Sequence, residues 1–243
     1  MNDIEKMLRG AVDLSPVEVE ELKVLKERIF SATKDKKEAR AEFEQKVKYL
    51  TAGLPSIYWD MTWKDFVGDP TARKIVQKYV DIIETAFDCG QGFIFSGPHG
   101  TGKTALSCLI GKAAIEKGYT VKYIPIGKIL DMIMQSFNDK SYKESLYTVI
   151  ERVEFLIFDD LGKEYLGVRK QLNPMVQLTL DAMLRERINR QLVTIASTNL
   201  TFDAMQSQYG DSVLSILHGC CKFQEVKGSD FRLIKGKQFW EKF

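Results

Sequence analysis

The chain of 243 residues is long enough for one α/β domain with a small appendage. Its net charge of +2 excludes a globally basic nucleic-acid binder, so any basic surface must be local. No apolar run is long enough to span a membrane, and residues 1–13 lack the apolar core of a secretory signal. The four cysteines lack C-x-x-C spacing, which argues against zinc and a disulfide framework and favours a cytoplasmic protein.

Residues 1–50 are expected to form a small helical extension, because they are dense in charged residues of both signs. Leu22, Leu25 and Ile29 recur at helical spacing and make one apolar stripe on a charged helix, and a second helix is expected over 34–50. Too few apolar residues are present for an independent core. The stripe is consistent with an arm that docks on a partner protein or with an extension that packs on its own domain.

The segment 97–104 carries the complete pattern G-x-x-x-x-G-K-[S/T]. An expected short strand at 92–96 precedes it and an expected helix at 105–117 follows it, which is the context that this motif requires. The glycines let the backbone turn its N–H groups inward around phosphate oxygens, and the helix adds its positive dipole end. The predicted phosphate-binding residues are Gly97, Pro98, His99, Gly100, Thr101, Gly102, Lys103 and Thr104.

Two residues of this loop have a specific chemistry with a nucleoside triphosphate. Lys103 supplies a positive charge to the outer phosphates, and the Thr104 hydroxyl can ligate Mg²⁺. The sequence therefore predicts ATP and Mg²⁺ as cofactors.

A second apolar strand, at 153–158, leads into Asp159 and Asp160 in the Walker B pattern. Ligands of open α/β sheets bind at the carboxyl ends of the strands, so this strand carries both acids to the nucleotide. We assign Asp159 to the Mg²⁺ shell and Asp160 to the activation or orientation of the attacking water. Two carboxylates so close need a metal or a basic partner, since one would otherwise stay protonated.

A third predicted strand, at 192–197, leads into Asn199. An asparagine at this sheet edge can sense the γ-phosphate or hold the water, or it can cap the helix expected at 201–209. Further strands are expected at 120–125 and 222–226, and an additional helix at 142–151 precedes the Walker B strand.

Together these motifs resemble the DnaC-like AAA+ ATPases, which comprise bacterial and phage replicative-helicase loaders and the related IstB-type transposition helpers. The resemblance spans roughly residues 49–233. The motifs that carry it are the loop at 97–104, the additional helix at 142–151, Asp-Asp-Leu-Gly at 159–162, Ser-Thr-Asn-Leu at 197–200 and Ser-Asp-Phe-Arg at 229–232.

The resemblance implies an α/β P-loop NTPase fold: a RecA-like parallel sheet of about five strands flanked by helices, with an ATPase domain at 51–243. Only eleven residues follow Arg232, so no C-terminal lid domain is expected. The implied catalytic residues are Lys103, Asp160, Asn199 and Arg232, of which the last can reach the γ-phosphate. The implied partners are single-stranded DNA, a hexameric DnaB-like replicative helicase contacted by residues 1–50, and further copies in an ATP-dependent homo-oligomer.

Two residues depart from the family pattern. Ser212 and Ile216 stand where relatives have arginines, the second of which acts in trans on a neighbour's ATP. Because such an arginine stabilises transition-state charge, we predict an ATPase that is weak alone or stimulated by a partner, unless Arg185, Arg187 or Arg190 substitutes.

The leading functional hypothesis is therefore an ATP-dependent helicase loader. The alternatives are a transposition helper that acts on DNA with a transposase, and an ATP-gated binding module with negligible hydrolysis. In the loader, Lys140 and Lys143 beside the additional helix are candidate contacts to DNA phosphates.

Overall fold

The computed structural model describes residues 16–33, 35–162 and 174–231. The chain divides into two compact units, Met1–Asp60 and Met61–Phe243. The division falls after Asp60, whereas the boundary expected from the sequence follows residue 50. In the described ranges, no helix combines the length and the apolar character needed to cross a membrane.

The described part of the smaller unit is a pair of helices followed by a short 3-10 turn. These elements are α2 (Pro16–Ala32), α3 (Lys36–Thr51) and η1 (Ser56–Tyr58). The stripe of Leu22, Leu25 and Ile29 is buried against Ala39 and Phe43 of α3. The expectation that this region cannot build a core of its own was therefore wrong, because α3 supplies the second apolar face. The stripe is consequently not a free docking surface.

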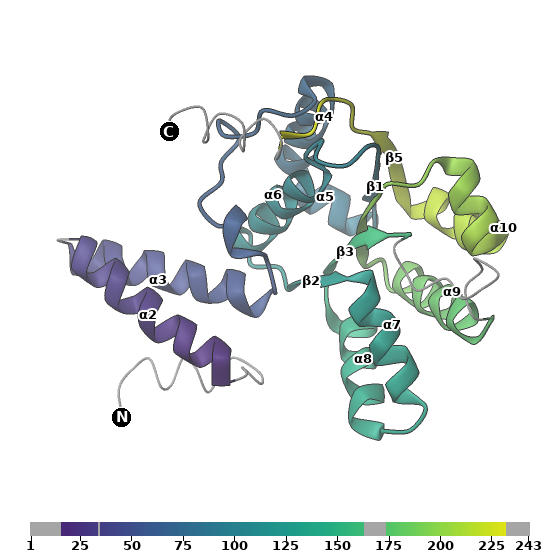
Figure 1. The fold of residues 1–243 in the computed structure, drawn as a ribbon, viewed down its shortest axis with the longest axis horizontal. Coiled ribbons are helices and arrows are strands. Elements are labelled where there is room, and N and C mark those ends of the chain that lie inside the picture. Colours follow the sequence, from purple (N-terminus) through teal and green to yellow (C-terminus); the bar gives the residue numbers. More distant parts are fainter. Residues whose placement is uncertain (1–15, 34, 163–173, 232–243) are drawn as a thin grey trace. The chain divides into compact units, whose positions relative to one another are not determined.

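The larger unit is built on a sheet whose five described strands all run parallel, in the order β2-β3-β4-β1-β5. The strands are β1 (Gly92–Ser96), β2 (Val121–Pro125), β3 (Phe155–Leu161), β4 (Val193–Thr198) and β5 (Cys221–Glu225). This arrangement, shown in Figure 1, confirms the predicted P-loop NTPase sheet. β1, β3 and β4 are buried along nearly their whole length because helices cover both of their faces.

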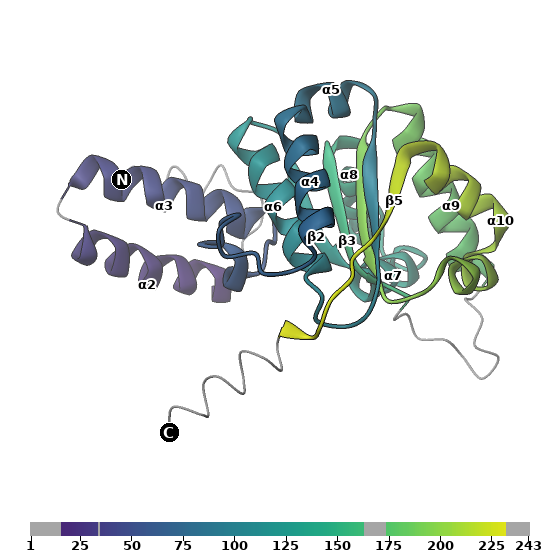
Figure 2. The same cartoon turned by 90° about the horizontal axis from the view of Figure 1, so that it is seen from above.

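Helices cover the two faces of this sheet in separate groups (Figure 2). One face carries α4 (Pro70–Asp81), α5 (Ile83–Asp88) and α6 (Lys103–Glu116). The other carries α7 (Ile126–Ser136), α8 (Lys140–Arg152), α9 (Pro174–Asn189) and α10 (Phe202–Cys220). One detail differs from the expected elements: α10 continues through a non-helical Gly210 to Cys220, beyond the helix expected at 201–209. Between α4 and α5 the helix is interrupted at Ile82.

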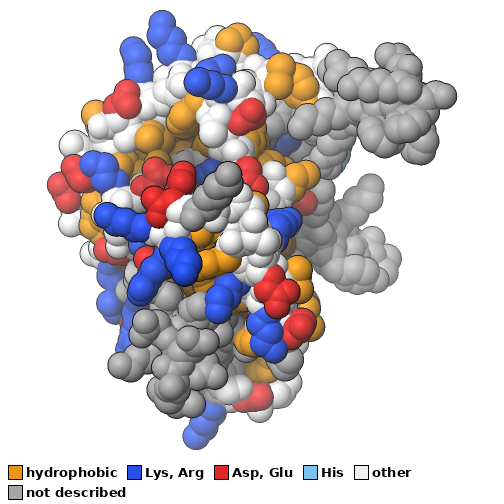
Figure 3. Space-filling view, turned by 90° about the vertical axis from the view of Figure 1, so that its left-hand side faces the viewer, with side chains coloured by type: hydrophobic (Ala, Val, Ile, Leu, Met, Phe, Trp, Pro, Cys, Tyr) orange, Lys and Arg blue, Asp and Glu red, His pale blue; other side chains and the backbone are white. Residues whose placement is uncertain are grey.

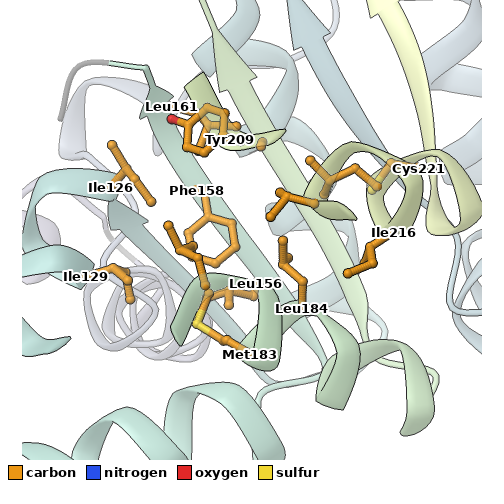
Figure 4. Packing of buried hydrophobic residues seen from close by; sticks show 14 of the residues in the cluster. Ile126, Ile129, Leu156, Phe158, Leu161, Met183, Leu184, Tyr209, Ile216 and Cys221 are labelled. Carbon is orange, nitrogen blue, oxygen red and sulfur yellow. The ribbon is translucent and has the colours of Figure 1, made fainter. Parts of the chain in front are cut away.

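The core on the second face fixes the strands that carry the site. Leu156 and Phe158 of β3 pack there with Ile129 of α7, Leu184 of α9 and Ile216 of α10 (Figure 4). Each such side chain stabilises the fold by about 1.5–3 kcal/mol when it leaves water. β3 is thus held rigidly, and the acids at its end are placed by the core rather than by a loop.

Charges of both signs are interspersed on the surface face shown in Figure 3, with apolar side chains between them. This mixture agrees with the net charge of +2. A contact with nucleic acid therefore requires a local cluster of lysines or arginines.

Candidate nucleotide-binding site

The predicted site residues in the described part of the chain meet at the carboxyl edge of the sheet, as the strand order requires. The phosphate-binding loop at 97–104 connects β1 to α6, β4 is hydrogen-bonded to β1, and β3 is hydrogen-bonded to β4. The loop therefore lies beside the ends of β4 and β3, which lead into Asn199 and Asp159. Three segments far apart in sequence supply one polar cluster.

Lys103 is the cation of this cluster, and its side chain points back along the loop. Its Nζ donates to the carbonyl oxygens of Gly97 at 2.8 Å and Pro98 at 2.6 Å, and to Asn199 Oδ1 at 2.8 Å. A buried ammonium needs such acceptors, since an unpaired charge would be costly away from water. Phosphate oxygens are stronger acceptors of the same kind, so they can replace these partners.

Asp159 is a buried carboxylate surrounded by hydroxyl groups. The Thr104 hydroxyl donates to its two oxygens at 3.0 and 3.2 Å. The hydroxyls of Tyr123 on β2 and Ser197 on β4 also donate to it. These three donors fix the direction of the carboxylate. A threonine hydroxyl and a carboxylate held together are oxygen ligands of the type that Mg²⁺ prefers, so the donor set fits this ion.

The sequence did not identify Tyr123 and Ser197 as site residues. Both lie on the strands that flank β3, and β2 pairs with β3 in a register that places Pro125 opposite Asp159. A polar residue lies in each of the two neighbouring strands in the sequence. This signal points to the site only when the order of the strands in the sheet is known.

Asp160 lies in an irregularity of β3. The pairing with β4 shifts its register between Phe158 and Leu161, and Asp160 has a left-handed φ of 62°, which aspartate tolerates better than most residues. Its N–H donates to Ser197 Oγ at 3.2 Å. A bulge of this kind redirects side chains at the end of a strand. In a regular strand, the consecutive residues Asp159 and Asp160 would point to opposite faces of the sheet.

Asn199 does not cap the following helix. Thr201 is the N-cap of α10, and its hydroxyl accepts from the Ala204 N–H at 3.3 Å. The Asn199 side chain is directed to Lys103 instead, so of the two roles considered for it only the one at the nucleotide site is consistent with the structure.

A family model described as IstB-like ATP binding protein matches residues 4–238 of the chain. The chain belongs to the IstB-like ATP binding proteins. This confirms the resemblance read from the motifs.

Two of the individual relatives are named for different roles, one for an insertion sequence and one for helicase loading. The IS21 putative ATP-binding protein of Pseudomonas aeruginosa is 25% identical over 177 residues, which are 70% of this chain and 62% of that protein. The replicative helicase loader DnaC of Buchnera aphidicola subsp. Baizongia pistaciae is 32% identical over 74 residues, 30% of each chain. The chain spans less than two thirds of the length of three of the curated relatives, with 47%, 62% and 66% of them aligned.

Solved structures show the same fold. The crystal structure of the DnaC helicase loader superposes with a TM-score of 0.58 at 20% identity, covering 71% of this chain and 100% of that chain. A replication initiator, DnaA bound to AMPPCP and single-stranded DNA, gives a TM-score of 0.58 at 19% identity, covering 76% of this chain and 55% of that chain. Helicase loaders and initiators thus share the architecture of this IstB-like protein.

The arginines considered as substitutes for the missing one have definite positions in this IstB-like chain. Arg187 is completely buried, so it cannot reach a neighbouring molecule, and that expectation was wrong. Arg190 pairs with Glu186 and Glu151 on the surface.

Arg185 is the substitute that lies nearest to one of the departing positions. It is an exposed residue that pairs with Asp181, and its Nη2 donates to Ser212 Oγ at 2.7 Å. A guanidinium therefore lies beside Ser212, one of the two positions at which the resemblance led us to expect an arginine.

Arg232 lies outside the described residues. The described segment before Arg232 does reach the site: the Phe231 N–H donates to Gly100 O at 3.1 Å.

Proposed function

We propose that this IstB-like protein is an ATP-dependent loader that binds a replicative DNA helicase through residues 1–60 and delivers it onto single-stranded DNA. ATP acts as a switch, in which binding orders the DNA-contacting surface and hydrolysis releases the partner. The observation that carries the ATP-dependent part is the Lys103 ammonium, which bonds loop carbonyls and Asn199 at the sheet edge beside Asp159.

The roles of the residues follow from this geometry. On ATP binding, Lys103 exchanges its carbonyl partners for phosphate oxygens, which frees Asn199 to contact the γ-phosphate. Thr104 and Asp159 would hold Mg²⁺, which supplies charge neutralisation between the outer phosphates. Asp160 orients the attacking water. Tyr123 and Ser197 keep the Asp159 carboxylate directed at its ligand.

Lys103→Ala tests the nucleotide site. We expect at least a ten-fold loss of affinity for Mg²⁺-ATP by calorimetry, because the variant removes the one buried cation of the loop. Lys117→Ala is the matched control: this lysine follows the same helix α6 but pairs only with the exposed Glu84. Equal affinity of Lys103→Ala and the unaltered protein would refute the assignment.

Helix α8 is the proposed contact to single-stranded DNA. Lys140 and Lys143 are exposed, as are Tyr142 and Tyr147, and Lys143 Nζ lies 5.8 Å from the centre of the Tyr147 ring. Aromatic rings beside lysines form the combination that stacks bases and binds phosphates. Affinity for a single strand in the presence of ATP should therefore fall steeply with salt. Undetectable binding at low salt would remove the main support for a loader.

A second candidate function is a helper ATPase in DNA transposition. It is favoured by the relatives named for insertion sequences, which align with 70% of this chain. Co-purification with the replicative helicase of the host supports the loader. ATP-dependent filaments on duplex DNA without helicase binding support the transposition helper.

Hydrolysis should be slow for the protein alone and faster with helicase and single-stranded DNA, because neither Ser212 nor Ile216 supplies a guanidinium. Rapid turnover by the purified protein, abolished in Lys103→Ala, would contradict this part of the proposal. No stimulation by either partner in a single-turnover assay would favour an ATP-gated binding module.

A further inference from the structure

The segment that follows β5, residues 226–231, runs along the outside of the phosphate-binding loop, and we call it the strap. In Figures 1 and 2 the chain leaving β5 (yellow) passes beside α4. Its backbone N–H groups fasten it at three points. Val226 donates to Ser96 O at 2.7 Å, Lys227 to Asp69 Oδ2 at 2.9 Å, and Phe231 to Gly100 O at 3.1 Å.

At Gly97 and Gly100 the loop lies too close to the strap to carry a side chain of its own. A Cβ atom added to Gly97 would lie 2.4 Å from Val226 O, and one added to Gly100 would lie 1.9 Å from Asp230 Oδ1. Both glycines also have positive φ values, of 137° and 71°. Because packed backbones do not deform freely, a displacement of the strap must move the loop.

Asp69 is the residue that joins the strap to the rest of the unit. Its Oδ1 accepts from the N–H groups of Thr71 at 2.8 Å and Ala72 at 3.2 Å, which makes it the N-cap of α4. Its Oδ2 accepts from Lys227 of the strap. Burial acts to raise the pKa of Asp69, but the N–H groups of Lys227, Ala72 and Thr71 outweigh it and lower the pKa below the ordinary value. Asp69 is thus ionised at neutral pH. One of its carboxylate oxygens caps α4, and the other accepts the hydrogen bond from the strap.

A cavity of about 510 Å³ opens beside the loop, between the two segments that Asp69 connects. Val67, Gly68 and Thr71 line one wall, and Lys227 and Phe231 of the strap line the other. Asp69 bridges the walls directly, so its bond to Lys227 sets their separation.

We propose that Asp69 is a positioning residue for nucleotide binding: by clamping the strap to the start of α4, it holds the loop and its side cavity in the geometry that accepts ATP. This inference rests on the proposed ATP site. It assigns Asp69 no contact with the nucleotide and no part in the chemical step.

Asp69→Asn separates the clamp from the helix cap. Asparagine caps helices as well as aspartate does, with its single amide oxygen, but its NH₂ group cannot accept the Lys227 N–H. We expect the variant to bind Mg²⁺-ATP about three- to ten-fold more weakly by calorimetry, the scale of losing one charge-assisted hydrogen bond. The single-turnover hydrolysis rate at saturating ATP should stay within about two-fold, and Asp69→Ala should bind at least as weakly as Asp69→Asn.

Asp139→Asn is the matched control, because Asp139 caps α8 through the Ser141 N–H at 2.8 Å without any contact to the strap. It should leave ATP affinity unchanged. Full affinity in Asp69→Asn with a loss only in Asp69→Ala would overturn the clamp and assign the effect to the cap. Equal losses in Asp69→Asn and Asp139→Asn would overturn it as general destabilisation. If the unaltered protein binds no ATP, the proposed ATP site fails first, whereas normal binding by both Asp69 variants refutes the clamp alone.

Discussion

Arg187→Met removes the most extensively bonded side chain described in the protein. The guanidinium of Arg187, on α9, is fully buried and donates to six oxygens. These acceptors are Val149 O, Ile150 O, Val153 O, Glu154 O, Val193 O and Thr194 Oγ1, at 2.6–3.4 Å. Burial lowers the pKa of Arg187 to about 9, so the group remains charged at neutral pH. Methionine has a similar length but no donor.

The magnitude follows from the carbonyls that lose their donor. Val149 and Ile150 belong to the last turn of α8, where carbonyl oxygens have no intrahelical partner, and Val153 follows the helix directly. Each buried carbonyl left unpaired costs about 1 kcal/mol or more, so the three together cost about 3 kcal/mol. For a unit of this size, roughly 2–4 °C of melting temperature corresponds to 1 kcal/mol, which gives a decrease of about 6–12 °C.

Thermal unfolding followed by circular dichroism measures this decrease, and hydrogen exchange of residues 140–152 locates it. Arg190→Met is the matched control, since Arg190 forms only exposed ion pairs, worth about 0–1 kcal/mol. A stability of Arg187→Met within 1 kcal/mol of the unaltered protein would refute the idea that this arginine anchors α8. Equal losses in both variants would refute it as well.

Two further substitutions test the site and the smaller unit. Tyr123→Phe removes one of the hydroxyls that hold Asp159, so half-maximal hydrolysis should require about ten-fold more Mg²⁺. Tyr79→Phe, whose hydroxyl bonds the Gln91 carbonyl instead, should leave the Mg²⁺ requirement unchanged, and an equal effect of both would contradict the role of Tyr123. Phe43→Ala should destabilise the smaller unit by about 3–5 kcal/mol, seen as faster proteolysis within residues 16–60, without changing ATP affinity. A proteolysis rate equal to that of the unaltered protein would contradict this.

The sheet and its phosphate-binding loop could be predicted because their signals are local. A strand buried on both faces often reads as a continuous apolar run. A glycine-rich loop of this pattern between a strand and a helix typically binds phosphate groups. The break at Ile82 gave no such signal, because no glycine or proline marks it.

The neighbours of the motif residues could not be predicted in the same way. Tyr123, Ser197 and Asp69 act through contacts between segments that are distant in sequence, and only the strand order shows that they converge. Arg187 is the clearest example. As one of several arginines in a charged segment it reads as a surface residue, and only the positions of α8 and β4 show six acceptors around it.

The smaller unit shows how a correct pattern can suggest the wrong surface. The stripe on α2 was visible in the sequence, and a second stripe at Ala39 and Phe43 was available to cover it. Because the two stripes pack together, the helicase in the proposed loader would have to contact other side chains, such as Val17 and Val24, which are 68% and 61% exposed.

The boundary of this unit also decides how its role should be tested. The segment after α3 is tied to it: Asp60 pairs with Lys46 of α3, and the Leu54 N–H donates to Tyr49 O of α3 at 3.0 Å. Removing residues 1–50 would leave this segment without the helix that it packs on, so a loss of helicase binding could then reflect local misfolding. Removing residues 1–60 takes away the whole unit. If the proposed loader is correct, that deletion should abolish helicase binding while ATP affinity is retained, because every described group at the nucleotide site belongs to Met61–Phe243.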